Sequence, residues 1–158
     1  METMTLTEPI TKSSLVLTEI KNLNFDRIKF KLSVKEDGEI WSKEKIDFAE
    51  EEYKRFLTLI KTYPKKSIVP SKIMDEFWHM HILDTEAYRN DCQTIFGRFV
   101  DHFPYFGIYG NDDRNELMKS FEETKRIYLE HFNTILVDSD ASRCEGKPCH
   151  APTSCKCR

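Results

Sequence analysis

Histidines and aspartates are concentrated in one otherwise apolar stretch of the chain, residues 69–84. This stretch contains Asp75, His79, His81 and Asp84 among isoleucine, methionine, phenylalanine and tryptophan side chains, and His102 follows less than twenty residues later. Polar groups buried among apolar side chains need partners, because their desolvation is costly. Imidazole and carboxylate groups are the protein ligands that zinc, iron and manganese share. The sequence therefore predicts a metal site drawn from these five residues.

The spacing of the two central histidines limits how that site can be built. On a helix, which turns about 100° per residue, His79 and His81 point roughly 160° apart and cannot hold one ion together. His81 falls within the apolar arc, whereas His79 lies on the polar side, one turn after Asp75. A shared site therefore requires either His102 or a break in the helix near His79, because side chains two apart share a face only in an extended backbone.

Four of these five residues also have a structural interpretation. His81 can be a buried neutral imidazole bonded to a carboxylate or a carbonyl group, or alternatively a general base. Asp75 and His79 can form a surface pair one helical turn apart. Asp84 can cap a following helix.

A second group of possible metal ligands lies at the end of the chain. Four of the five cysteines, Cys144, Cys149, Cys155 and Cys157, fall within the last fifteen residues. The first twenty residues contain no secretory signal pattern, so we expect a cytoplasmic protein, in which such thiols indicate metal ligands before disulfides. Cys-x-Cys pairs suit zinc or copper. Because the spacing is not that of a paired Cys-x-x-Cys ribbon, a redox-sensitive, crosslinked or modified tail remains an alternative.

Helical periodicity and capping residues predict an all-α fold. The predicted helices are a short one within 25–34, one over 43–62 capped by Ser42, one capped by Ser71, one over 85–96 capped by Asp84 and ended by Gly97, and one from Asn111 or Asp112 to about Ile135. We expect one compact domain of four to five helices over residues 21–136. Residues 1–20 are predicted to be a flexible lead-in, and residues 137–158 a Cys-rich tail that is disordered or ordered by metal.

Charge and hydropathy indicate no nucleic-acid partner and no membrane. The net charge is 24 − 27 = −3, and no apolar run approaches the length of a membrane span. The aromatic loop 103–109 is a different kind of feature, because an exposed aromatic patch can dock a protein partner.

Several motifs in order resemble one family. They are Asp75-x-x-Trp78-His79-x-His81-x-x-Asp84-Thr85, Tyr88-x-x-Asp91-Cys92 and Phe96-Gly97-Arg98. Over roughly residues 24–134 the chain resembles the glycine-rich-domain-containing proteins, and residues 102–107 resemble the compact bacterial relatives of that family. The resemblance implies a shared domain rather than an activity, and the chain lacks the Gly-rich region of the plant members.

Three functions follow from these observations. The first is a metal-binding protein that uses the His/Asp cluster and the Cys-rich tail. The second is a non-catalytic interaction module with structural histidines, and the third is an enzyme whose metal activates water or oxygen. No residue is singled out as catalytic beyond His81 or Asp75 as a possible base.

Overall fold

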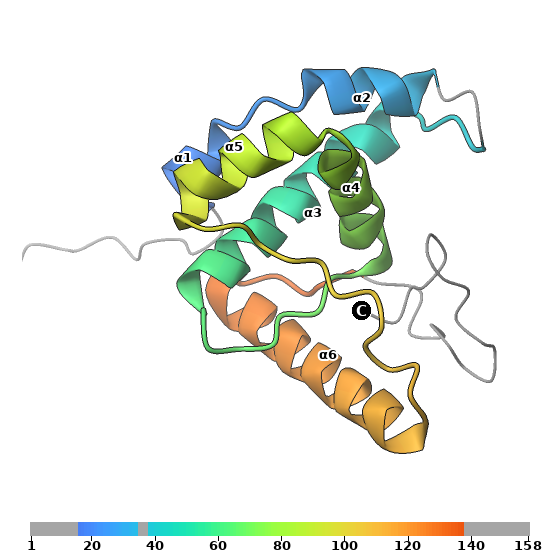
Figure 1. The fold of residues 1–158 in the computed structure, drawn as a ribbon, viewed down its shortest axis with the longest axis vertical. Helices are drawn as coiled ribbons and strands as arrows, with labels where there is room; N and C mark the ends of the chain where they lie inside the picture. Colours follow the sequence, from blue (N-terminus) through green and yellow to red (C-terminus); the bar gives the residue numbers. More distant parts are fainter. Residues whose placement is uncertain (1–15, 35–37, 138–158) are drawn as a thin grey trace, which may run out of the picture.

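The computed structural model of the chain describes residues 16–34 and 38–137, and every regular element in these ranges is a helix (Figure 1). The helices are α1 (Thr18–Lys21), α2 (Asp26–Ser33), α3 (Lys43–Thr62), α4 (Lys72–Leu83), α5 (Thr85–Phe96) and α6 (Asn111–Phe132). This confirms the predicted all-α fold. The sixth helix, beyond the four to five expected, is the four-residue α1, whose Ile20 is fully buried. None of the described helices is both long enough and apolar enough to cross a lipid bilayer.

The central helices begin and end at the residues that the sequence indicates. The hydroxyl groups of Ser42 and Ser71 accept the backbone N–H groups of Lys45 and Met74, at 3.2 and 3.4 Å. Gly97 ends α5 in the left-handed conformation, with φ of 66°. These signals are local, so they act in the same way whatever the rest of the chain does.

The start of α6 differs from the prediction. Its first turn has no side-chain cap, and Gly110, at φ of 111°, precedes Asn111. Asp113 instead uses its carboxylate to accept the N–H groups of Gly107 and Tyr109, at 2.7 and 3.1 Å. The first turn of α6 therefore fixes the aromatic loop. The helix ends at Phe132, three residues earlier than expected, because Asn133 adopts a left-handed φ of 53°.

Helix α3 runs through the middle of the fold, with α2 and α5 above it, α4 to its right and α6 below it in the view of Figure 1. Aromatic rings fill the space between α3 and α4. The Tyr53 and Phe77 ring centroids are 5.2 Å apart, and those of Phe56 and Trp78 are 5.0 Å apart. This packing buries one face of α4, and it leaves the opposite side of that helix for Asp75 and His79.

A candidate metal centre

Asp75, His79 and His102 come together at one point, although they arise from two segments of the chain. One ligand atom from each residue lies within 4.8 Å of the others. His102 Nε2 is 2.8 Å from Asp75 Oδ1, and His79 Nε2 is 3.8 Å from the same oxygen. We call these three residues the His/Asp cluster.

Helix α4 supplies two members of the cluster because it is unbroken. The helix is regular from Lys72 to Leu83, so Asp75 and His79 lie one turn apart on the same side, as the helical projection predicts. His102 comes from the loop that joins α5 and α6. His102 therefore completes the cluster. The alternative route to a shared site, a break in the helix near His79, is not present.

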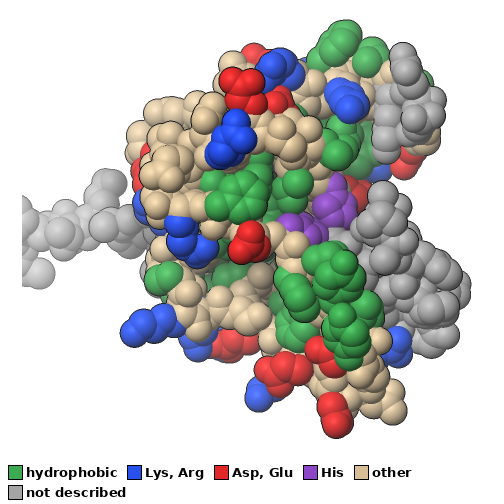
Figure 2. All heavy atoms as spheres, viewed as in Figure 1, with side chains coloured by type: hydrophobic (Ala, Val, Ile, Leu, Met, Phe, Trp, Pro, Cys, Tyr) green, Lys and Arg blue, Asp and Glu red, His purple; other side chains and the backbone are tan. Residues whose placement is uncertain are grey.

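The cluster lies partly in the protein and partly at its surface. The side chain of Asp75 is 4% exposed and that of His102 is 9% exposed, whereas that of His79 is 26% exposed. Figure 2 shows histidine side chains at the surface on this face of the molecule, above a patch of hydrophobic side chains. An ion held here would thus be reached by solvent from the His79 side.

Ring packing holds the imidazole of His102 in place. The ring centroid of Trp78 is 4.3 Å from that of His102, and the ring of His79 lies 4.7 Å away. Trp78 is itself fixed, because its indole N–H donates to the hydroxyl of Tyr88 at 3.0 Å. The orientation of His102 therefore depends on a rigid, buried tryptophan.

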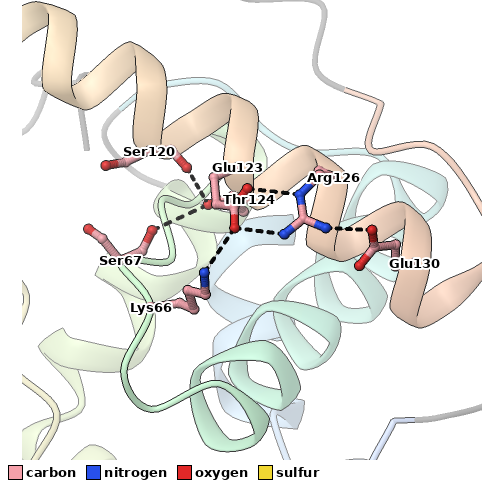
Figure 3. A network of polar contacts seen from close by, with 7 residues as sticks. All are labelled: Lys66, Ser67, Ser120, Glu123, Thr124, Arg126 and Glu130. Carbon is pink, nitrogen blue, oxygen red and sulfur yellow. Dashed lines mark hydrogen bonds and ion pairs between the residues drawn. The ribbon is translucent and has the colours of Figure 1, made fainter.

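Helix α6 contacts the segment that leads into α4 at Lys66 and Ser67 (Figure 3). The hydroxyl of Thr124 accepts the backbone N–H of Val69 at 3.0 Å and donates to the carbonyl of Ser120 at 2.9 Å. Lys66, on the same connecting segment, pairs with Glu123 at 3.1 Å (Figure 3). Because Val69 lies two residues before the Ser71 cap, this network fixes the start of α4. It thereby also fixes the position of Asp75 in the first turn of that helix.

The separations within the cluster are compatible with a single ion. Ligand atoms about 2.1 Å from a tetrahedral metal lie about 3.4 Å apart. The two distances from Asp75 Oδ1, 2.8 and 3.8 Å, lie on either side of that value. The third separation, between the two imidazoles, is no more than 4.8 Å.

Asp75 and His102 form a hydrogen bond within the cluster. The separation of 2.8 Å between Asp75 Oδ1 and His102 Nε2 requires a proton between them, whichever atom carries it. An ion that binds both atoms must displace that proton. Metal binding at the cluster is therefore expected to weaken in acid.

His81, which the sequence placed among the possible ligands, lies apart from the cluster in the core. Its Nδ1 is 2.9 Å from the hydroxyl of Tyr53, and its Nε2 is 2.9 Å from Asp91 Oδ2. Both ring nitrogens therefore have protein partners. Burial lowers the pKa of His81, against the opposing effect of the Asp91 carboxylate. The arrangement corresponds to the buried imidazole of the structural interpretation.

Asp84 also lies outside the cluster. Its carboxylate accepts the backbone N–H of Ala87 at 3.3 Å, as the N-cap of α5, and pairs with Arg27 at 2.8 Å. The cysteines of the predicted tail site, Cys144, Cys149, Cys155 and Cys157, lie outside the described residues. The structure therefore brings together three of the five predicted His/Asp ligands.

The two polar partners of His81 are Tyr53, which is buried in the core, and Asp91, which is half-buried, and neither was predicted as a site residue. Asp91 belongs to the Tyr88-x-x-Asp91-Cys92 motif, and its spacing of ten residues from His81 crosses the turn at Asp84. Tyr53 lies on the apolar stripe of α3, where it looks like any other core residue. Only the packing of α3 and α5 against α4 identifies the two as partners of one histidine.

Comparison with known proteins assigns the family. A family described as UCP032817-like matches residues 17–125, which is more than half of the chain, and the protein belongs to this family. The resemblance to the glycine-rich-domain-containing family is therefore wrong as an assignment. The matched region includes the whole His/Asp cluster. No curated protein and no solved structure gives a match.

Proposed function

We propose that the protein binds one divalent transition-metal ion through Asp75, His79 and His102. The observation that carries the proposal is the convergence of three ligand atoms within 4.8 Å, from one turn of α4 and from a loop. Two imidazoles and one carboxylate favour zinc, iron(II) or manganese over calcium or magnesium, which prefer oxygen ligands.

The composition of the cluster leaves room for chemistry at the ion. Three protein ligands and a side open to solvent are the arrangement in which a metal keeps a water molecule as a further ligand. A bound divalent ion makes such a water more acidic and polarises oxygen atoms of a substrate. An ion held in this way could bind without catalysing a reaction, or could serve a metal-dependent enzyme.

Metal titration of the full-length chain tests the proposal. Replacing Cys144, Cys149, Cys155 and Cys157 with serine removes the tail thiols as competing ligands. Zinc binding, measured by calorimetry, should then reach one equivalent per chain. Cobalt(II) should bind to the same extent and show the weak absorption bands of a site with nitrogen and oxygen ligands. Asp75→Asn, His79→Gln and His102→Gln should each lower the affinity at least about a hundredfold, since each removes a direct ligand.

His131→Gln is the matched control for the histidine variants. His131 lies on α6 beside Tyr63, with 3.2 Å between its Nδ1 and the phenol oxygen, and is not part of the cluster. Its replacement should leave the affinity unchanged. Binding of less than about a tenth of an equivalent of any of the three metals, or equal affinity in the His79 and His131 variants, refutes the proposal.

A second function is supported by a separate feature, the aromatic patch of Phe103, Tyr105 and Tyr109. We propose that this patch docks a protein partner. Its rings contact one another, with centroids 5.6 and 6.5 Å apart, and Tyr109 is 73% exposed. The carboxylate of Asp113 holds the loop in shape, so the patch is presented without a large ordering cost.

Crosslinking and affinity capture from the native host test the docking proposal. Tyr105→Ala with Tyr109→Ala should remove specific partners, whereas Phe30→Ala should not. Phe30 is a suitable control because it is an exposed aromatic residue on α2, away from the loop. Phe106 is unsuitable for the test because it packs against the core. Identical partners for all three proteins count against docking at the patch.

A further inference from the structure

The hydroxyl group of Tyr88 lies between two parts of the molecule that determine the position of His102. Its oxygen accepts the indole N–H of Trp78 at 3.0 Å, and its proton is donated to the backbone carbonyl of Val100. An indole N–H can only donate and a carbonyl can only accept, so the direction of both bonds is fixed. Burial raises the pKa of Tyr88, so the hydroxyl keeps the proton that the second bond needs.

The two bonds act on different parts of His102. The ring of Trp78 packs on the imidazole, with centroids 4.3 Å apart, so a fixed indole also fixes the orientation of the imidazole. Val100 lies two residues before His102, so a fixed carbonyl there also fixes the backbone that leads to the imidazole. Helix α5 and the segment that follows it run in opposite directions (Figure 1). This path returns Val100 to Tyr88, which lies in the first turn of α5.

The ring of Tyr88 is held by packing that does not involve its hydroxyl. The side chain is 2% exposed, and the rings of His81 and Phe99 meet it edge to face, with centroids 5.0 and 5.2 Å away. Replacement of Tyr88 by phenylalanine keeps this packing and removes only one oxygen atom. The effect of the hydroxyl can therefore be measured in a protein that retains its core.

We infer that Tyr88 is a positioning residue of the metal centre, because its hydroxyl holds both the ring that packs on His102 and the backbone that leads to it. The inference rests on the proposed metal binding at the His/Asp cluster. Groups that orient a metal ligand without touching the ion typically contribute about ten- to a hundredfold to the affinity. Tyr88 acts on the imidazole through intermediates, so we expect the lower end of this range.

Zinc titration of Tyr88→Phe tests the inference, in the full-length chain with the four tail cysteines replaced by serine. The affinity should fall about tenfold. The cobalt(II) absorption bands should also shift, because they depend on the geometry of the ligands. Trp78→Phe is a second variant, which keeps a ring beside His102 but lacks the N–H and remains decisive if Tyr88→Phe does not fold. It should also lose affinity, and the double variant should lose less than the two single losses combined.

Tyr53→Phe is the matched control. Tyr53 is also a buried tyrosine, but its hydroxyl lies 2.9 Å from Nδ1 of His81 and not between the supports of His102. Its replacement also removes one buried hydrogen bond, so both phenylalanine variants should lose a similar amount of stability in urea without metal. Tyr53→Phe should keep the zinc affinity and the cobalt(II) bands of the unchanged protein.

Three results overturn the inference while leaving metal binding at the cluster intact. The first is a zinc affinity in Tyr88→Phe and in Trp78→Phe within about twofold of that of the unchanged protein. The second is an equal loss of affinity in Tyr88→Phe and Tyr53→Phe, which would show that the affinity follows overall stability. The third is a double variant in which the two losses combine in full, as they do for independent sites. An absence of zinc binding by the unchanged protein is distinct from these, because it refutes the proposed function and the inference together.

Discussion

Replacing Thr124 with valine tests how the start of α4 is held. Valine keeps the shape of threonine but cannot accept the N–H of Val69, which is buried and 3.0 Å from the Thr124 hydroxyl. That hydroxyl also donates to the carbonyl of Ser120 four residues earlier, at 2.9 Å, a local bond whose loss has little net effect. It lies 3.5 Å from the carbonyl of Ser67, at the long limit of a hydrogen bond. The cost of the substitution therefore comes from one stranded amide.

The expected loss is about 2 kcal/mol of unfolding free energy, the usual cost of leaving a buried backbone donor without an acceptor. For a domain of this size it corresponds to a fall of about 8 °C in Tm. Urea unfolding followed by tryptophan fluorescence measures the stability. Hydrogen exchange at the Val69 amide should quicken more than exchange in the middle of α3, because the protecting bond is lost there.

Thr94→Val is the matched control for this substitution. Thr94 makes the same kind of bond to the carbonyl four residues earlier, at 2.9 Å from Asn90, but it is exposed and accepts nothing from another segment. Its replacement should change the stability by less than about 0.5 kcal/mol. If Thr124→Val and Thr94→Val unfold at the same urea concentration, the proposed tie between α6 and the start of α4 is wrong.

Three further predictions concern charged groups. Asp84→Ala should lose about 1 kcal/mol of stability with the helix cap but leave zinc affinity unchanged, and a large loss of affinity would make Asp84 a ligand after all. Burial raises the pKa of Glu52, against bonds from Tyr128 and Arg55, so its contribution to stability falls as pH rises above the ordinary glutamate value. Glu52→Gln should thus gain stability relative to the unchanged protein between about pH 4 and pH 8, and a constant difference in urea midpoints would contradict this. Burial lowers the pKa of His81, so the unfolded chain takes up its proton first and the domain should lose stability as pH falls below about 6.5. His81→Phe should flatten that loss in the same assay, and an unchanged slope would point to another group.

The parts of the fold that the sequence predicted well are those whose causes are local. Helix α3 matches its predicted range at both ends, because Ser42 caps its start and Pro64 follows its end. The sequence of α2 fits two patterns, because Ile28, Phe30, Leu32 and Val34 alternate as in a strand, whereas Phe25, Ile28 and Leu32 have helical spacing. Its burial is helical, with Ile28 and Leu32 inside and Phe30 68% exposed. The packing of α2 on α3 therefore selects the helical repeat over the strand-like alternation.

Features that depend on contacts between distant segments were not predictable. The four-residue α1 has no periodicity of its own and follows the burial of Ile20. At the start of α6, Asn111 and Asp112 looked like caps, but the carboxylate of Asp113 serves the preceding loop instead. An aspartate near the start of a helix can accept N–H groups either from the helix or from the preceding loop. Only the path of the loop determines which of the two it binds.

The candidate site likewise has one part that follows from local helix geometry and one part that depends on tertiary packing. Asp75 and His79 share a helix turn, so their pairing follows from the helical repeat alone. His102 reaches them along a loop whose path depends on contact with Trp78 and on Gly107. Gly107 has a φ of 86°, and a Cβ atom added to it would lie 2.5 Å from the side chain of Leu117. The sequence therefore left two routes to a shared site, His102 or a break in the helix, and tertiary packing brings His102 there.

The buried carboxyl group of Asp75 offers a final test of what the cluster is for. Burying an acidic side chain costs free energy, and an amide in its place would accept the hydrogen bond of His102 at lower cost. Asp75→Asn should therefore leave the metal-free protein as stable as before, within about 1 kcal/mol, or more stable, while removing zinc binding. Unfolding in urea with and without zinc measures both effects. A metal-free variant that loses more than about 3 kcal/mol would instead make the Asp75–His102 pair a structural element of the fold.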